Sequence, residues 1–510
     1  MCKMIDQYAD KIKGIFSFFD RIIINGYFRP LLSEKSRIGY LHSMGIPLRD
    51  FTQYFKNSTD RLITRIESTA HELGRPLVYL PSAKDKKEDI AKAFLLSNPV
   101  DSGLICVLKT LEACKTAKVV GPEGKQFLKS SLTKCLHYYL YYLDKEFGFM
   151  FVKIQTWFPF NIQVYINGRE LMKHVFDVNG ISYECYDNSF THISDVAKAQ
   201  QLADKFDSSR LCRRLDAFAK SVNPFLDTVL KFFGQGYFWC VNQCEFATDV
   251  MFKERSFLED IYPSLVGHAF YDLTVTDVFT FMGRKPDPRF QGEAVSDYKK
   301  RPIGCRVKFK LKSNSVKMYD KCSVLRIETT INNPREFKVF GTVRHRDGTE
   351  SSQWKPMGKS ISNLYRYAEV SKACNQRFLD AMTDIVPVKS VQEEIGTVCS
   401  GKTVKGKRVP GFNVWSPEVV RIMEAVSDGR YLINGFRNRD ISQTVFPKMR
   451  DEKKRSSKTS RLLKKLRRHG LIKKVSRSRR YHVTSKGRRI MGTLIELYHK
   501  DYPELIAKAA

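Results

Sequence analysis

Hydrophobic and polar positions repeat with different periods along the chain, and the changes of period mark the predicted elements. The run "TQYFKNSTDRLITRIESTAHELG" has apolar positions three and four residues apart, which predicts an amphipathic helix closed by Gly74. "PLVYL" and "GLICVL" predict buried strands, and "DRIIINGYFRPL" predicts a hairpin that turns at Asn25-Gly26. This alternation predicts an N-terminal α/β domain over residues 1–150.

The middle of the chain passes from an aromatic stretch to helices and then to period-two strands. From about Tyr139, "HYYLYYLDKEFGFMFVKIQTWFPFNIQVYINGREL" indicates either a strand pair with bulky core packing or a stacking surface for bases. Residues 193–233 have helical spacing with a break at Pro224. "GYFWCVNQCEFATDVMF" and "SVKMYDKCSVLRIETTINN" are the clearest strand patterns, which predicts a central antiparallel-sheet domain over residues 151–345. Residues 346–410 are expected to form a helical and linker region.

The last segment, residues 411–510, follows the order helix, helix, helix, strand, basic turn, strand and helix. Its third helix, "SSKTSRLLKKLRRHGLI", places Leu462, Leu463 and Leu466 on one face. This order resembles the winged-helix DNA-binding domains of the MarR type, and the resemblance implies that the third helix enters the major groove. The predicted fold class is therefore an α+β multidomain protein, with an N-terminal α/β region, a central antiparallel sheet and a C-terminal winged helix.

The net positive charge of the chain indicates the kind of partner that it binds. The chain of 510 residues carries a formal charge of +33, and 29 Lys plus Arg stand against nine Asp plus Glu from Gly401 onward. Such a surface is well explained by a polyanionic partner, so we expect DNA, with a structured RNA as the alternative. The basic residues predicted to contact nucleic acid are Arg461, Lys464, Lys465, Arg467, Arg468, Lys473, Lys474, Arg477, Arg479, Arg480, Arg488 and Arg489.

Other classes are disfavoured by the sequence. The twelve cysteines include no C-x-x-C pair, which argues against a zinc site and a disulfide framework. No apolar run reaches the eighteen residues that a membrane span needs, and charges interrupt the N-terminus where a signal peptide would be apolar. We therefore expect a cytoplasmic protein with reduced thiols and no membrane partner, while the sequence leaves its oligomeric state open.

Candidate chemistry is concentrated in "SVKMYDKCSVLRIETTINN". A hairpin turning at Lys321-Cys322 would set Lys317 opposite Arg326, and this like-charge pair would need an anion such as phosphate between its members. The same polar face would carry Tyr319 and Glu328. Lys317 and Arg326 would lower the pKa of a nucleophilic Tyr319 by favouring the phenolate.

Carboxylates on strands suggest a metal site beside this hairpin. Glu245 and Asp249 are four residues apart on one strand face, about 13 Å by strand rise, so both could act only with a bulge between them. With Glu328 they are the predicted ligands of Mg²⁺ or Mn²⁺. Such a cation would polarise a scissile phosphate for nucleophilic attack.

The motif "VKMYDK...VLRIE" resembles the tyrosine strand and the following acidic strand of replication initiators of rolling-circle plasmids and filamentous phages. The resemblance implies that Tyr319 attacks a DNA phosphate, with Glu328 as a metal or orienting ligand and Glu245 and Asp249 on the earlier acidic strand. The chain departs from that pattern in having no His-hydrophobic-His pair. The segments "GRPLVYL", "QTWFPF" and "MYDK...LRIETTINNP" are also similar to large bacterial proteins of mobile-element character.

Three functions fit these patterns. The first is a metal-dependent DNA endonuclease or transesterase of a mobile element or replicon, which nicks and joins strands. The second is a non-enzymatic winged-helix regulator that binds DNA, and the third is a protein that binds a structured RNA through aromatic strands and a basic surface.

Overall fold

The computed structural model describes residues 3–122, 125–286, 290, 294–301, 305–345, 347–383, 391–404, 406–432, 435–476, 478–496 and 498–499. The chain divides into two compact units, each made of discontinuous segments. The first unit contains Met1–Ile12, Phe252–Ser323 and Gln376–Ala510, and the second contains Lys13–Met251 and Val324–Asn375. The four consecutive domains expected from the sequence stay a prediction, because two such units neither require nor exclude smaller domains within them.

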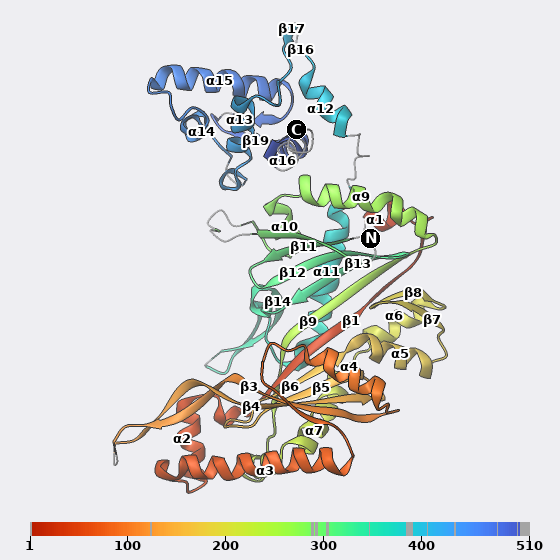
Figure 1. Ribbon diagram of the computed structural model, residues 1–510, viewed down its shortest axis with the longest axis vertical. Coiled ribbons are helices and arrows are strands. Elements are labelled where there is room, and N and C mark those ends of the chain that lie inside the picture. Colours follow the sequence, from red (N-terminus) through yellow and green to blue (C-terminus); the bar gives the residue numbers. More distant parts are fainter. Residues whose placement is uncertain are drawn as a thin grey trace. The chain divides into compact units, whose positions relative to one another are not determined.

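A mixed sheet forms the framework of the second unit, and its strands run in the order β13, β9, β1, β6, β5, β4, β3 and β2 (Figure 1). The bounds are β1 Ile12–Tyr27, β2 Leu77–Leu80, β3 Gly103–Val120, β4 Phe127–Asp144, β5 Gly148–Gln155, β6 Ile162–Asn167, β9 Phe238–Phe252 and β13 Val324–Ile331. Strand β2 pairs with β3 in parallel, whereas β13 pairs with β9 antiparallel. The strand patterns of the sequence are thus confirmed, but "PLVYL" is largely exposed, with Leu80 its one buried residue.

Helices and hairpins surround this sheet. The helices of the second unit are α2 Glu34–Ser43, α3 Phe51–Glu72, α4 Lys87–Ser97, α5 Gly168–Val178, α6 Val196–Asp204, α7 Ser208–Val222, α8 Phe225–Phe233 and the start of α11 Leu364–Ala381. Its two-stranded sheets are β7 Tyr183–Tyr186 with β8 Ser189–Ile193, and β14 Lys338–Arg344 with β15 Glu350–Pro356. Helix α3 is the predicted amphipathic helix, and Gly74 follows it with a positive φ of 61°, which suits glycine.

The aromatic stretch that begins near Tyr139 belongs to the core. Its middle strand β5 pairs antiparallel with β4 on one side and with β6 on the other. Tyr138, Tyr139 and Tyr141 are buried, so their rings are not available to stack on bases. Core packing is therefore the correct alternative for these residues.

The predicted hairpin at Asn25-Gly26 is wrong, because both residues lie inside the long strand β1. Gly26 pairs with Ile162 on β6. A Cβ atom at Gly26 would lie 2.5 Å from Ile162 Cγ2 and 2.7 Å from Trp239 Cζ3. Glycine is present here to allow close packing, and the turn signal of Asn-Gly is overridden by tertiary contacts.

Gly26→Ala should therefore lower the free energy of unfolding by about 1–3 kcal/mol, the usual cost of overpacking a core. The matched control is Gly39→Ala in helix α2, where no atom lies within 4 Å of the added Cβ. That control should raise stability by about 0.5–1 kcal/mol, because glycine is unfavourable inside a helix. Urea denaturation of both variants measures the difference, and equal effects would contradict the packing argument.

The first unit contains a three-stranded part and a helical part. Its elements are α1 Lys3–Gln7, α9 Arg255–Tyr271, α10 Val275–Phe281, β10 Ala294–Lys300, β11 Cys305–Leu311, β12 Asn314–Lys321, α12 Val391–Cys399, β16 Lys402–Val404 and β17 Lys407–Val409. The C-terminal elements are α13 Pro417–Ser427, α14 Asn438–Val445, α15 Glu452–Arg468, β18 Ile472–Lys474, β19 Tyr481–Val483 and α16 Ser485–Glu496. Their order agrees with the predicted order of elements. No helix in the described part of the chain has the length and apolar character to cross a bilayer.

Candidate functional site

Three neighbouring strands of the second unit bring carboxylates together. Asp20 lies on β1, Glu245 on β9 and Glu328 on β13, and β9 is the middle strand of the three. One carboxylate oxygen from each lies within 4.8 Å of the other two. Their side chains are 11%, 6% and 3% exposed, in that order, so the group is nearly enclosed and opens on the Asp20 side. We call these three residues the carboxylate site.

Arg326 holds one side of this site together. Its guanidinium is fully buried, with Nη2 2.8 Å from Asp20 Oδ1 and Nε 3.7 Å from Glu328 Oε2. Nη1 lies 3.3 Å from Asp249 Oδ1 and donates a hydrogen bond to the carbonyl oxygen of Asn188. Burial lowers the pKa of Arg326, but the three carboxylates more than offset this and raise it, so the side chain is charged.

Asp249 is not a member of the carboxylate site, contrary to its prediction as a metal ligand. It lies directly across from Arg326 in the β9–β13 pair, and its Oδ2 accepts a hydrogen bond of 3.1 Å from the backbone N–H of Phe190. Glu245 and Asp249 are thus separated along a strand pair without a bulge, and the three clustered oxygens include one from Glu245 and none from Asp249. Burial raises the pKa of Asp249 to about 6, although Arg326 acts to lower it.

This raised pKa gives a test by pH. Folded protein binds the Asp249 proton more tightly than unfolded protein, so the group contributes stability below its usual pKa of 3.8 that is lost as pH rises through about 6. The Asp249→Asn variant has no carboxyl group at this position and so lacks this pH-dependent contribution to stability. Its stability relative to the unsubstituted protein should therefore increase from about pH 4 to about pH 7. Chemical denaturation across that range measures the difference, and a pH-independent difference would contradict the assignment.

Arg21 and Tyr165 border the carboxylate site, and the sequence reasoning missed both of them along with Asp20. Arg21 Nη2 lies 2.7 Å from Glu245 Oε1, and its side chain is 38% exposed. Burial raises the pKa of Tyr165 to about 12, with Arg21 lowering it and nearby carboxylates raising it. The phenol is therefore neutral near pH 7 and can donate a hydrogen bond. The charged pair Asp20-Arg21 inside the apolar run "IFSFFDRIII" was the available signal.

Tyr319 and Lys317 lie on β12 in the first unit, whereas Arg326 and Glu328 lie in the second. Tyr319 is 9% exposed. It lies opposite Arg306 of the neighbouring strand β11, and Lys317 lies opposite Lys308 of the same strand. A joint site of Tyr319 with Glu328 therefore stays a prediction. Arg326 does not need the external anion predicted for it, because it already pairs with carboxylates of its own unit.

The composition of the carboxylate site suits a hard divalent cation. The three carboxylates of the site and the neighbouring Asp249 carboxylate form ion pairs with two guanidinium groups, those of Arg21 and Arg326. Oxygen ligands are those that Mg²⁺ and Mn²⁺ prefer. The three clustered oxygens could hold such an ion, which would offset the excess negative charge within this group.

The predicted nucleic-acid residues differ in how they are placed. The exposed ones are Arg461, Lys464, Arg467, Lys473, Lys474 and Arg479. The half-buried ones are Lys465, Arg468, Arg480, Arg488 and Arg489. Arg477 lies outside the described residues. The leucines Leu463 and Leu466 of α15 are buried in an apolar core with α13, so the basic side of this helix faces solvent as predicted.

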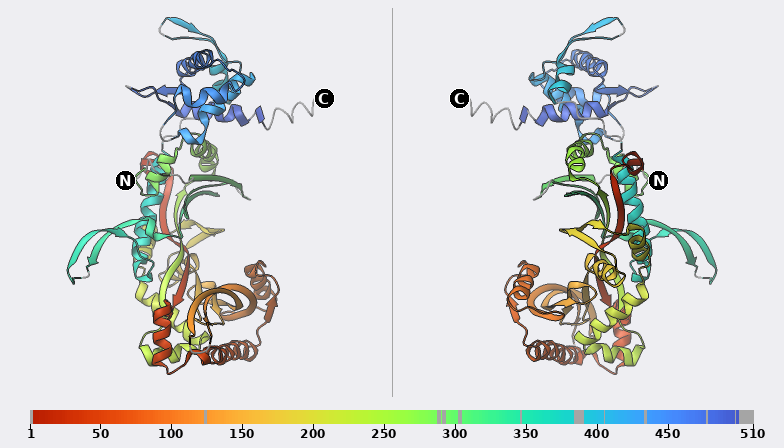
Figure 2. Two further views of the ribbon diagram at one scale, coloured as in Figure 1. Left: turned by 90° about the vertical axis from the view of Figure 1, so that its left-hand side faces the viewer. Right: turned by 90° about the vertical axis from the view of Figure 1, so that its right-hand side faces the viewer.

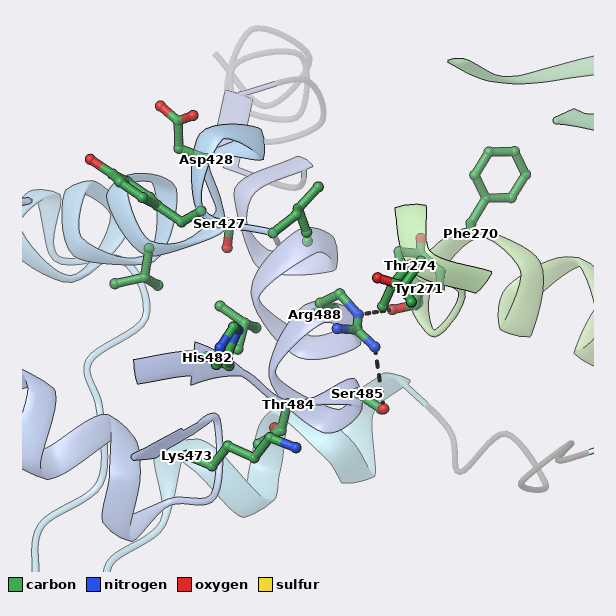
Figure 3. Close-up of a pocket in the computed structure, with 16 residues that line it drawn as sticks. Phe270, Tyr271, Thr274, Ser427, Asp428, Lys473, His482, Thr484, Ser485 and Arg488 are labelled. Carbon is green, nitrogen blue, oxygen red and sulfur yellow. Dashed lines mark hydrogen bonds between the residues drawn. The ribbon is translucent and has the colours of Figure 1, made fainter. Parts of the chain in front are cut away.

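A separate cavity of about 740 Å³ lies within the first unit, between the α9–α10 segment and the C-terminal elements (Figure 3). Arg488 borders this cavity, and its guanidinium is held by two hydrogen bonds to backbone carbonyl oxygens. Nε donates to the Tyr271 carbonyl at 3.1 Å and Nη2 to the Asp272 carbonyl at 2.7 Å. Lys473 and His482 from β18 and β19 line the same cavity. Its described lining has Asp428 as the single carboxylate, so it lacks the clustered ligands of the carboxylate site.

The likenesses to rolling-circle initiators, MarR-type modules and mobile-element proteins rest on short sequence motifs. The geometry of the carboxylate site comes from the residues of this chain alone. Comparison with known proteins adds no relative: no family model, no curated protein and no solved structure matches the chain.

Proposed function

We propose that this protein binds nucleic acid and cleaves a phosphodiester bond with a divalent cation held at the carboxylate site. The observation that carries the proposal is the meeting of Asp20, Glu245 and Glu328, whose oxygens lie within 4.8 Å on three adjacent strands. Mg²⁺ or Mn²⁺ there would polarise a phosphoryl oxygen and stabilise developing negative charge.

Side chains around the site suit a phosphate substrate. Arg21 is partly exposed beside Glu245, so its guanidinium can both orient that carboxylate and contact a phosphate oxygen. Tyr165 keeps its proton near pH 7, so its hydroxyl can donate a hydrogen bond to a phosphate oxygen. Covalent attack by Tyr319, with nicking and joining of DNA strands as in a replicon initiator, is the finer form of the proposal.

Nucleic-acid binding is supported by charge and by the C-terminal elements. The chain has a formal charge of +33. Helix α15 presents Arg461, Lys464 and Arg467 to solvent above a buried apolar face. In a winged helix of the MarR type, α15 would be the recognition helix, and the turn between β18 and β19 would contact the backbone of the duplex.

A second candidate function is a DNA-binding regulator without catalysis. It is favoured by the contacts of Arg326, which already pairs with Asp20, Asp249 and Glu328 and so gives these carboxylates a structural partner. Buried ion networks of this kind exist without any chemistry. The two functions differ in whether a divalent cation and a cut strand are observed.

The test is incubation of the full chain with end-labelled single-stranded DNA, supercoiled DNA and folded RNA, in Mg²⁺, Mn²⁺ or EDTA. We expect metal-dependent cleavage of DNA on denaturing gels and none in EDTA. A protein-linked strand that disappears in Tyr319→Phe would support the transesterase form, while metal-dependent hydrolysis retained in Tyr319→Phe would exclude it. Binding of DNA without cleavage in either metal would overturn the enzymatic proposal and favour the regulator. Preference for folded RNA would favour the RNA-binding alternative.

A further inference from the structure

The hairpin of β14 and β15 stands away from the sheet of the second unit (Figure 2). In its register Phe340 lies directly opposite Trp354, with Thr342 opposite Ser352 two residues further along. Side chains two apart on a strand share one face. The hairpin therefore has one face formed by Lys338, Phe340, Thr342, Arg344, Glu350, Ser352, Trp354 and Pro356, which we call the aromatic face.

Both rings of the aromatic face are open to solvent. Phe340 is 53% exposed and Trp354 67% exposed. Their ring centroids are 5.8 Å apart at an interplanar angle of 67°, so each ring supports the other edge to face while leaving surface uncovered. Large aromatic side chains grouped in this way on a projecting element typically mark a binding surface.

Cationic side chains lie on both faces of the hairpin. On the far side of the hairpin, a Cβ atom at Gly341 would lie 3.1 Å from Arg366 Nη2 and 3.4 Å from Lys355 Cε, which places both cationic side chains behind the Phe340 strand. Lys338 and Arg344 are exposed on the aromatic face itself. Glu350 faces Arg344 and offsets part of this charge. The hairpin therefore combines stacking surface with net positive charge.

We propose that the aromatic face binds the bases of single-stranded nucleic acid by stacking on Phe340 and Trp354, while Lys338 and Arg344 of the same face contact phosphates. Stacking on aromatic side chains needs unpaired bases, since a duplex hides their faces, and it tolerates any sequence. This inference rests on the proposed function and adds to it the form of the substrate. Tyr138, Tyr139 and Tyr141 of β4 are buried, whereas Phe340 and Trp354 are a pair of exposed rings in contact with each other.

The test is fluorescence anisotropy of labelled oligo(dT), about 20 nucleotides long, and of a duplex of equal length, with the full chain in EDTA. EDTA separates this test from cleavage, so failure of the enzymatic proposal does not affect the result. We expect Trp354→Ala and Phe340→Ala each to weaken oligo(dT) binding by about 10-fold or more, as the loss of one stacked base predicts. Binding of the duplex should stay within about 2-fold, because winged-helix contacts do not involve the hairpin.

Two controls sharpen the experiment. Trp354→Phe keeps an aromatic ring and should retain most of the affinity for oligo(dT). Tyr79→Ala removes another exposed ring of the same unit, on β2, and should leave the affinity unchanged. Unaltered thermal unfolding of each variant confirms that the fold is intact. Equal losses for oligo(dT) and duplex, no loss in the Phe340→Ala/Trp354→Ala double variant, or no binding of oligo(dT) by the unsubstituted protein would each overturn the inference.

Discussion

Glu328→Gln should reduce metal-dependent cleavage by about 10²- to 10³-fold, the cost of removing one charged group from a preorganised site. Glutamine keeps the shape of the side chain but removes the negative charge that a divalent cation needs. Glu245→Gln should have an effect of similar size, because the two oxygens belong to the same cluster. The cleavage rate at saturating Mn²⁺ measures the effect on the chemical step. Calorimetric titration with Mn²⁺ measures the effect on metal binding.

The matched control is Glu259→Gln, which removes a carboxylate that pairs with Arg255 on the surface of helix α9. It should leave both the cleavage rate and Mn²⁺ binding unchanged. If Glu328→Gln bound Mn²⁺ as tightly as the unsubstituted protein, the cation would not be held at the carboxylate site. Normal binding of duplex DNA by every variant would show that the loss lies in chemistry rather than in substrate affinity.

Arg326→Met should lower the free energy of unfolding by about 3–5 kcal/mol, the usual effect of removing one partner from a buried ion pair. The side chain is fully buried against Asp20, Asp249 and Glu328, so its loss leaves these carboxylates uncompensated. Arg430→Met removes an exposed guanidinium that pairs with Asp428, and it should cost at most about 1 kcal/mol. Urea denaturation near pH 7 measures both variants.

The origin of the destabilisation can be checked with a second substitution. If uncompensated charge is the cause, Asp249→Asn should recover part of the stability lost in Arg326→Met, since it removes one of the buried carboxylates. A loss below about 1 kcal/mol in Arg326→Met would show that solvent or another cation replaces the guanidinium. In that case the network would not fix the positions of the carboxylates.

Local patterns were sufficient to locate most elements. The spacing of apolar residues predicted α3 and its end at Gly74. Both signals are local, because the helical period and the positive φ of a glycine depend only on residues close together in the chain. Pro224 separates α7 from α8 for a similarly local reason. Period two likewise identified β9 and β13 as strands. The Asn25-Gly26 signal failed because packing against Ile162 and Trp239 is a contact between residues far apart in the chain.

The sequence by itself determined that Glu245 and Glu328 lie on strands, that charge collects near the C-terminus, and that a basic helix carries a buried leucine face. Only the tertiary structure decided that β9 lies between β1 and β13. This order brings Asp20 into the carboxylate site and lets Asp249 form an ion pair with Arg326. Strand order and register depend on pairing between distant segments. A single sequence states which side chains a strand carries, but not which strand lies beside it.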